Sequence, residues 1–401
     1  MRILMLSWEY PPRIVGGVSR VVHDLAQKLG EQGNEVHIVT CWEQGAADEE
    51  KDKHVFVHRV RCYEIGTNNF IDWVLHLNFT FLERCIKLIN QKDKGTFSFD
   101  IIHAHDWIVA FAARVVKNSY TIPMVSTIHA TEWGRNWGIH NDVQRYISSV
   151  EWWLAYESWK VIVNSEYMNN EVRHVFNLPV DKIRVIPNGV DLDKFNGYSM
   201  DLNYRRNFAA DNEKIIFFVG RLVNEKGAHI LLDAMPKILK YYYDAKLVIT
   251  GKGSQMDFLK EKTLSMGISN KVYFTGYISD EDLSRLYMCV DVAVFPSLYE
   301  PFGIVALEGM VANVSVVVSD TGGIGEIVEH GIDGMKAYAG NSDSLADSII
   351  ETLRNPGKAE EMRGKALEKI NHIYNWNVIS KQAMSTYEEV IYESRTINWG
   401  G

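Results

Sequence analysis

Residues 292–308 read VAVFPSLYEPFGIVALE, an apolar run followed by a short loop and a second apolar segment. The run Val292–Pro296 is typical of a strand that is covered on both faces of a parallel sheet. We expect a helix to begin near Gly303, so that Glu300 lies on the loop and Glu308 lies in the helix. This strand, loop and helix predict an α/β fold in which ligand-binding loops follow the carboxyl ends of parallel strands.

The same alternation of strands and helices occurs in both halves of the chain. In the first half, an apolar run at Arg2–Ser7 precedes a loop and the amphipathic segment Val18–Gln32. In the second half, the run Ile215–Val219 is again followed by a loop and a helical segment. Parallel strands joined by helices form Rossmann-like domains. We therefore predict two Rossmann-like domains that face an interdomain cleft, with residues 1–191 in the first domain and residues 192–375 in the second.

The composition of the 401-residue chain argues against several classes of protein. A formal net charge of −9 lacks the basic footprint that a nucleic-acid-binding protein needs. No apolar run reaches the roughly 20 residues of a membrane span, and the first residues do not have the pattern of a signal peptide. The four cysteines are scattered, with no metal-ligand spacing. We expect a cytoplasmic protein with reduced cysteines and no nucleic-acid partner.

The segment Phe70–Ile89 is rich in aromatic and aliphatic residues. A helix that lies on a membrane surface usually carries many Lys and Arg residues on its polar face. This segment offers Arg84 and Lys87 against Asp72 and Glu83. We therefore expect a packed or acceptor-side helix and no membrane contact.

Loops suited to an anionic ligand follow the first strand of each half. Gly16-Gly17 precedes a predicted helix, where glycines let the backbone approach a phosphate and the free N–H groups can bind it. A tight turn without a ligand would explain the same pair of glycines. Arg221 and Lys226 follow the run Ile215–Val219, and two cations at this position suit a diphosphate leaving group. The alternative is that both are ordinary surface charges, which are common for Lys and Arg. Neither loop has a dinucleotide-binding or P-loop motif, which argues against a hydride-transfer enzyme and an ATPase.

Two further patterns raise the question of a metal site. His103-Ala104-His105 follows a predicted strand, and metal-dependent hydrolases bind metals with such a pair of histidines. The sequence lacks the second cluster of His and Asp residues that such a metal site needs. We therefore favour hydrogen-bonded histidines in a cleft. Asp191-Leu192-Asp193 has the form of a metal–diphosphate motif, but it lies in a polar segment between the domains. A solvated linker is the favoured interpretation, and we predict no metal.

Taken together, these motifs resemble glycosyltransferase family 4, and in particular its glycogen and starch synthase-like members, over nearly the whole chain. The segments that carry the resemblance are Gly16-Gly17, His103-Ala104-His105-Asp106-Trp107, Thr127-Ile128-His129, Pro187-Asn188-Gly189-Val190-Asp191, Gly220-Arg221, Lys226-Gly227, Thr250-Gly251-Lys252-Gly253, Phe274-Thr275-Gly276-Tyr277, Glu300 to Glu308 and Thr321-Gly322-Gly323. The resemblance implies the GT-B fold. It also implies that a last helix, at about residues 376–401, packs back on the first domain.

The resemblance implies roles for individual residues. Arg221 and Lys226 would bind the donor diphosphate, Glu300 would contact the transferred sugar, and His129 would lie at the reacting centre. The residues implied in donor binding are Gly16, Gly17, Lys252, Tyr277, Ile278, Phe302, Gly303, Ile304, Val305 and Glu308. On the acceptor side, His105, Asp106 and Trp107 are implied, since an aromatic face can stack on a sugar ring.

The implied activity is that of a retaining, metal-independent hexosyltransferase that needs no cofactor. The donor would be ADP-glucose or UDP-glucose, and the acceptor an α-glucan or another carbohydrate. A small-molecule or lipid acceptor is an alternative within the same class, and a metal-dependent hydrolase or a sugar-nucleotide epimerase is an alternative of another class. The base of the donor, the acceptor and the oligomeric state stay open at this point.

Overall fold

The computed structural model describes residues 1–63, 65–66, 69–90, 98–397 and 399. The chain divides into two compact units, the first formed by Met1–Gly189 and Trp376–Gly401 and the second by Val190–Asn375. The units therefore separate between Gly189 and Val190, slightly before the boundary predicted after Asp191. Each unit is a mainly parallel sheet with helices on both faces, and this is the fold class that the sequence predicted.

The sheet of the first unit has the strand order β3-β4-β2-β1-β5-β6-β7-β8. Its strands are β1 (Arg2–Leu6), β2 (Glu35–Cys41), β3 (Glu49–Asp52), β4 (Val55–Val60), β5 (Ile101–His105), β6 (Met124–Ile128), β7 (Lys160–Val163) and β8 (Ile183–Val185). All pairs are parallel except β3 with β4. The sequence prediction missed the β3–β4 pair, because β3 is a mostly exposed edge strand, EEKD, without an apolar pattern.

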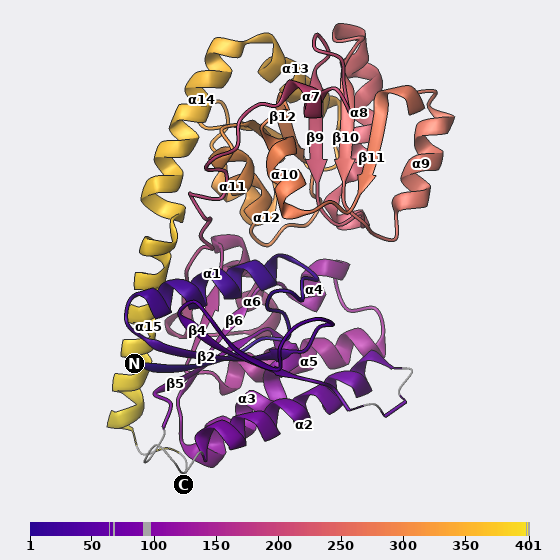
Figure 1. Ribbon diagram of the computed structural model, residues 1–401. Coiled ribbons are helices and arrows are strands. Elements are labelled where there is room, and N and C mark those ends of the chain that lie inside the picture. The colour runs from indigo at the N-terminus through magenta and orange to yellow at the C-terminus, as the bar shows by residue number, and fades with distance from the viewer. Residues whose placement is uncertain (64, 67–68, 91–97, 398, 400–401) are drawn as a thin grey trace. The chain divides into compact units, whose positions relative to one another are not determined.

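Helices cover both faces of this sheet (Figure 1). They are α1 (Gly17–Glu31), α2 (Phe70–Ile89), α3 (Ala110–Tyr120), α4 (Glu132–Asn136), α5 (Asp142–Glu157), α6 (Glu166–Phe176) and α15 (Trp376–Thr396). The helices α2, α3 and α5 share a hydrophobic core on one face of the sheet, and α1 packs against α15. The last helix thus belongs to the first unit, although residues 398, 400 and 401 of the predicted segment lie outside the described residues.

The sheet of the second unit has the strand order β11-β10-β9-β12-β13-β14, and every pair is parallel. Its strands are β9 (Ile215–Val219), β10 (Lys246–Thr250), β11 (Val272–Gly276), β12 (Val292–Phe295), β13 (Ser315–Ser319) and β14 (Met335–Ala337). Its helices are α7 (Leu202–Arg205), α8 (Ala228–Tyr241), α9 (Met256–Ser265), α10 (Asp280–Tyr287), α11 (Ile304–Val311), α12 (Gly322–Ile327), α13 (Ser342–Arg354) and α14 (Pro356–Lys369).

The order of the strands locates a ligand-binding edge in each unit. The chain moves outward in one direction from β1 and returns to add β5 on its other side, and β9 and β12 are related in the same way. In open parallel sheets, ligands bind outside the carboxyl ends of the strands at such a switch point. The loops that follow β1, β5, β9 and β12 are therefore the places to look for functional side chains.

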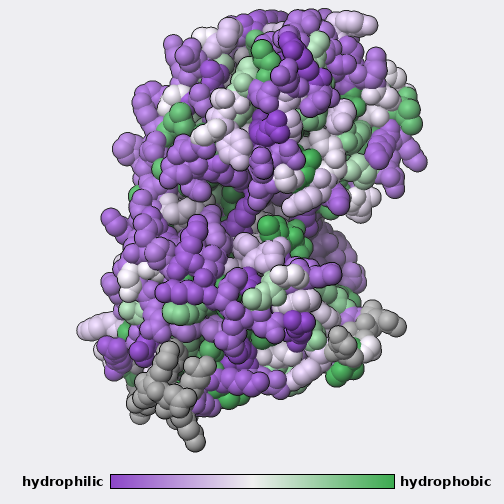
Figure 2. All heavy atoms as spheres, viewed as in Figure 1, coloured by the Kyte–Doolittle hydropathy of each residue, from purple (hydrophilic) through white to green (hydrophobic). Residues whose placement is uncertain are grey.

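The surface drawn in Figure 2 is mainly hydrophilic, with hydrophobic side chains in small separate groups. None of the described helices is long and apolar enough to cross a membrane. The segment predicted as a packed helix forms α2, whose residues Val74, Leu77, Phe81 and Cys85 are buried in the core of the first unit.

Candidate active site

Lys226 and Glu300 form an ion pair at the switch point of the second unit. Lys226 follows β9 and Glu300 follows β12, and Nζ of Lys226 lies 2.6 Å from Oε2 of Glu300. Both side chains are largely buried, with 20% and 11% of their surface exposed. Charged groups are rarely buried unless they are paired, so this pair is held in place by the fold around it.

The backbones of the two loops touch, which explains how such distant residues meet. Gly227 has a φ of 68°, and a Cβ atom there would lie 1.9 Å from the carbonyl oxygen of Pro296. The backbone N–H of Leu298 donates to the carbonyl of Glu225 at 2.7 Å. Only glycine permits both the left-handed conformation and this close approach, so Gly227 allows the ion pair to form.

Arg221, Lys252 and Tyr277 come from three neighbouring loops of the second unit. Arg221 lies beside Glu225, with 3.4 Å between Nη2 and Oε1, and is about half exposed. Nζ of Lys252 lies 5.7 Å above the ring of Tyr277, which is itself mostly exposed. The backbone N–H of Leu222 donates to the carbonyl of Lys252 and ties the first two loops together. The loops that follow β9 and β11 thus offer an accessible cation and an accessible ring.

Most of the remaining donor residues that were implied by the resemblance lie in α11 or just before it. Gly303 precedes the helix with a φ of 104°, so that Ile304 and Val305 form the first turn, where backbone N–H groups lack intrahelical partners. Phe302 is buried and packs edge-on against Tyr374, so its side chain belongs to the core. Ile278 also packs against this core as a partly buried residue.

Glu308 is buried inside α11 and forms an ion pair with Lys194. The sequence prediction did not include Lys194, which directly follows the Asp191-Leu192-Asp193 segment. That segment forms a turn in which Oδ1 of Asp191 accepts a hydrogen bond from the backbone N–H of Asp193 at 2.9 Å. Among the described residues, no three His, Cys, Asp or Glu side chains gather as a metal site requires.

In the first unit, Glu9 organises the glycine loop between β1 and α1. Its Oε2 accepts hydrogen bonds from the backbone N–H groups of Val15 and Gly16, both at 2.8 Å. Gly16 caps the helix that starts at Gly17, and a Cβ atom at Gly16 would meet no atom within 4 Å. Burial raises the pKa of Glu9, and the nearby charge of Asp106 acts in the same direction. The sequence prediction missed Glu9, although it is the one acid in the loop that follows the buried strand β1, and this was a signal.

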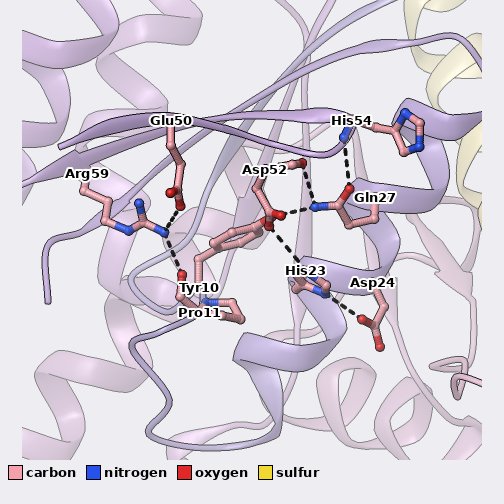
Figure 3. A network of polar contacts seen from close by, with 9 residues as sticks. All are labelled: Tyr10, Pro11, His23, Asp24, Gln27, Glu50, Asp52, His54 and Arg59. Atoms are coloured by element: carbon pink, nitrogen blue, oxygen red, sulfur yellow. Dashed lines mark hydrogen bonds and ion pairs between the residues drawn. The ribbon is translucent and has the colours of Figure 1, made fainter. Parts of the chain in front are cut away.

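A polar network holds the other end of the same loop (Figure 3). The hydroxyl of the buried Tyr10 donates to Oδ2 of Asp52 at 2.8 Å, and Arg59 donates to the carbonyl of Pro11 at 2.7 Å. Gln27 of α1 donates to the hydroxyl of Tyr10 and to the carbonyl of Asp52. The β3–β4 pair, which the sequence did not reveal, therefore supports the loop that carries Glu9 and the two glycines.

His129 follows β6, and the two residues after Ala104 hold it. The backbone N–H of His129 donates to Oδ1 of Asp106 at 2.8 Å, and Nε2 of its ring lies 3.1 Å from Nδ1 of His105. Asp106 adopts a φ of 60°, an uncommon conformation for a residue other than glycine. Burial lowers the pKa of His129, with Asp106 opposing the shift and Arg135 adding to it. Strand β5 therefore positions both the backbone and the ring of His129.

His105 and Trp107, which were assigned to the acceptor side, are both buried. The side chain of His105 is fully buried, so it reaches a ligand only through His129. Trp107 is 5% exposed and belongs to the core of the first unit, and its ring packs edge-on against the half-exposed Phe70 at the start of α2. The two ring nitrogens of His103 lie 2.7 Å from the hydroxyls of Tyr387 and Thr127. Neither nitrogen of His103 is therefore free to bind a metal.

Comparisons with known proteins agree on one family. Residues 15–194 match the family described as Glycosyltransferase Family 4, and residues 200–369 match Glycosyl transferases group 1. An uncharacterized glycosyltransferase of Methanocaldococcus jannaschii is 38% identical over 97% of this chain and 98% of its own length. Glycogen synthase of Mycobacterium tuberculosis is 32% identical over 96% of this chain and 94% of its own.

Solved structures share the fold over almost the whole chain. Sucrose-phosphate synthase from Thermosynechococcus elongatus superposes with a TM-score of 0.83 at 22% identity, covering 98% of this chain and 99% of that one. Anabaena HepE in complex with UDP and glucose has a TM-score of 0.76 at 21% identity, with 97% and 100% covered. The catalytic domain of starch synthase IV from Arabidopsis thaliana, bound to ADP and acarbose, has a TM-score of 0.77 at 17% identity, with 98% and 99% covered.

Proposed function

Because the chain belongs to glycosyltransferase family 4, with the GT-B fold of two Rossmann-like domains, we propose that it transfers a hexosyl group from ADP-glucose or UDP-glucose to an α-glucan or another sugar acceptor. The chain is a transferase enzyme related to glycogen, starch and sucrose-phosphate synthases. The observation that carries the proposal is the ion pair between Lys226 and Glu300, at the carboxyl ends of β9 and β12.

The donor would bind to the second unit. As the glycosidic bond breaks, negative charge grows on the diphosphate, and fixed cations near that position stabilise the transition state. Lys226 and the more exposed Arg221 would supply those cations. Glu300 would accept hydrogen bonds from sugar hydroxyls, and Glu308 would accept them from the ribose. The N–H groups at the start of α11 add partial positive charge that does not depend on a metal ion.

Two similar structures support a sugar nucleotide of this kind. HepE was solved with UDP and glucose, and starch synthase IV with ADP and acarbose. Lys252 and Tyr277, which face each other at an accessible edge of the second unit, are the residues that we assign to the donor base. A ring on which a base can stack suits either adenine or uracil, and we therefore keep both donors.

The acceptor would bind to the first unit, where His129 and Asp106 follow β6 and β5. Glycogen synthase of Mycobacterium tuberculosis is the similar relative that favours a glucan acceptor. We propose retention of the anomeric configuration without a metal, with the departing diphosphate taking the proton of the acceptor hydroxyl. Atoms and charge balance, since the glycosidic bond forms to the acceptor oxygen as the bond to the diphosphate breaks.

The test is a screen of donors against acceptors that measures the released nucleoside diphosphate. ADP-glucose and UDP-glucose are each incubated with glycogen, maltose, sugar phosphates, glycerate or no acceptor, with and without EDTA. We expect release that is faster with a carbohydrate acceptor and unchanged by EDTA. Conversion of the donor without release of diphosphate would indicate an epimerase, and loss of turnover with EDTA would overturn metal independence.

A further inference from the structure

His105 is a fully buried imidazole that contacts His129 directly. Nδ1 of His105 lies 3.1 Å from Nε2 of His129, and the two rings are nearly parallel, at an angle of 20°. The other ring nitrogen of His105, Nε2, is buried and has no hydrogen-bond partner among the described residues. The contact with His129 is therefore the hydrogen bond that determines where the proton of His105 is found.

The partnerless nitrogen decides between the two neutral forms of His105. If Nε2 carried the proton, a buried N–H group would lack an acceptor, and such orphaned donors are rarer in folded proteins than under-satisfied acceptors. If Nδ1 carries the proton, that N–H donates to Nε2 of His129, and only a lone pair is left without a partner. The second form has the lower cost and makes His129 the acceptor.

Surrounding contacts keep this geometry fixed. The ring of His103, two residues earlier on β5, lies 4.0 Å from the ring of His105, measured between centroids. His103 is in turn held by the hydroxyls of Tyr387 from α15 and Thr127 from β6. Asp106 holds the backbone N–H of His129, as described above. Neither ring can tilt without breaking a buried hydrogen bond.

We propose that His105 is a positioning residue that fixes His129 in the form protonated on Nδ1, so that this N–H is the group of the ring that can donate a hydrogen bond to an oxygen of a bound carbohydrate. A neutral imidazole has one donor and one acceptor, so the bond to Nε2 assigns the donor to Nδ1. Nδ1 of His129 has no hydrogen-bond partner among the described residues. The inference rests on the proposed function for its substrate, but the assignment of the proton does not.

The electrostatic surroundings agree with two neutral rings. Burial holds the pKa of His105 well below its usual range, and the neighbouring His103 and His129 act in the same direction. A neutral His129 donates a directional hydrogen bond without placing a second positive charge beside Arg135, which already lowers the pKa of His129.

The direct test is nitrogen-15 NMR of the histidine rings in the full chain, which identifies the protonated nitrogen of each neutral imidazole. We expect His129 to carry its proton on Nδ1 in the wild type and in His105→Asn, whose amide N–H can replace the lost donor. In His105→Leu, the preference of the His129 proton for Nδ1 over Nε2 should weaken. A wild-type His129 protonated on Nε2, or an unchanged His129 in His105→Leu, would overturn the proposal.

Kinetics provide the second measurement. We expect His105→Leu to lower kcat about tenfold with little change in the KM for the donor, since one misdirected hydrogen bond raises the barrier by about 1.4 kcal/mol. We expect His105→Asn to restore most of the lost kcat. His37→Asn is the matched control, because His37 forms another buried imidazole pair, 3.0 Å from His58, away from His129. Equal losses in all three variants would contradict the inference. If no sugar nucleotide is turned over, the proposed function fails, while the NMR result still decides the position of the proton.

Discussion

Glu151 on α5 is a carboxyl group that is almost completely removed from solvent, with 1% of the residue exposed. Both of its oxygens accept from the backbone N–H of Glu132, just after the loop that carries His129. Burial raises its pKa well above 4.5, and this hydrogen bond only partly opposes the shift. Glu151 therefore links the stability of the first unit to pH.

The sign of that linkage gives a prediction at the scale of one residue. Between pH 4.5 and its raised pKa, Glu151 binds more protons in the folded than in the unfolded state, so stability falls as the pH rises through this window. We expect Glu151→Gln to gain in unfolding temperature over the wild type between pH 5 and pH 7. Thermal unfolding at both pH values measures this, with the exposed Glu388→Gln as the control. A parallel response of wild type and Glu151→Gln would contradict the prediction.

At the scale of elements, α11 and the loop before it depend on Gly303. Its φ of 104° lies in the region that favours glycine, and an added Cβ would lie 2.7 Å from the side chain of Ile324 in α12. The sharp turn lets the chain leave β12, carry Glu300 past the switch point and enter a buried helix. A side chain at this position would strain the backbone and push α12 away.

We therefore expect Gly303→Ala to destabilise the second unit by about 1–3 kcal/mol, the usual cost of a strained backbone. The matched control is Gly364→Ala in α14, where an added Cβ would meet no atom within 4 Å. That change should stabilise the same unit by about 0.5–1 kcal/mol, because alanine favours a helix. Urea unfolding, followed by hydrogen exchange of β12 and β13, measures both effects. Equal effects of the two substitutions would show that the turn does not require glycine.

The elements also show what the sequence could and could not predict. The strands around β9 and β12 were predictable because both faces are buried and their residues are continuously apolar. Lys226 and Glu300 were predictable as candidates because they follow those strands. The burial of His105 and Trp107 could not be predicted, since a histidine or tryptophan after a strand can be in the core or on a surface. Glu9 and Lys194 lie on irregular segments, where no periodic pattern marks them. Helical periodicity places Tyr387 on the buried face of α15, but its hydrogen bond to His103, which is distant in sequence, could not be predicted.

At the scale of the whole molecule, the chain returns from the second unit to complete the first. The helix α15 begins at Trp376, whose ring would lie 2.6 Å from a Cβ atom added at Gly189. Farther along, Tyr387 is fully buried and bonds to His103 at 2.7 Å. The first unit is therefore discontinuous in sequence, and its stability depends on the last residues of the chain.

Two tyrosines of α15 allow this dependence to be measured. Tyr387→Phe leaves the buried Nδ1 of His103 without a partner, and we expect a loss of about 1–3 kcal/mol in the first unit. Tyr392→Phe changes a side chain that is 72% exposed and should have no effect. Hydrogen exchange reports each unit separately: β5 and β6 should lose protection in Tyr387→Phe, and β9 and β12 should not. Loss of protection in the second unit instead would contradict the assignment of α15 to the first.

The central claim is that the pair formed by Lys226 and Glu300 carries the transfer of the sugar. It is tested most directly by comparing Lys226→Met with Lys271→Met, since Lys271 lies in the same unit just before β11, at the opposite ends of the strands. The measurement is kcat/KM for release of nucleoside diphosphate from the preferred donor. We predict a loss on the order of a hundredfold or more for Lys226→Met, as for other groups that stabilise developing negative charge, and a value close to wild type for Lys271→Met. Turnover by a folded Lys226→Met that matches Lys271→Met would contradict the claim.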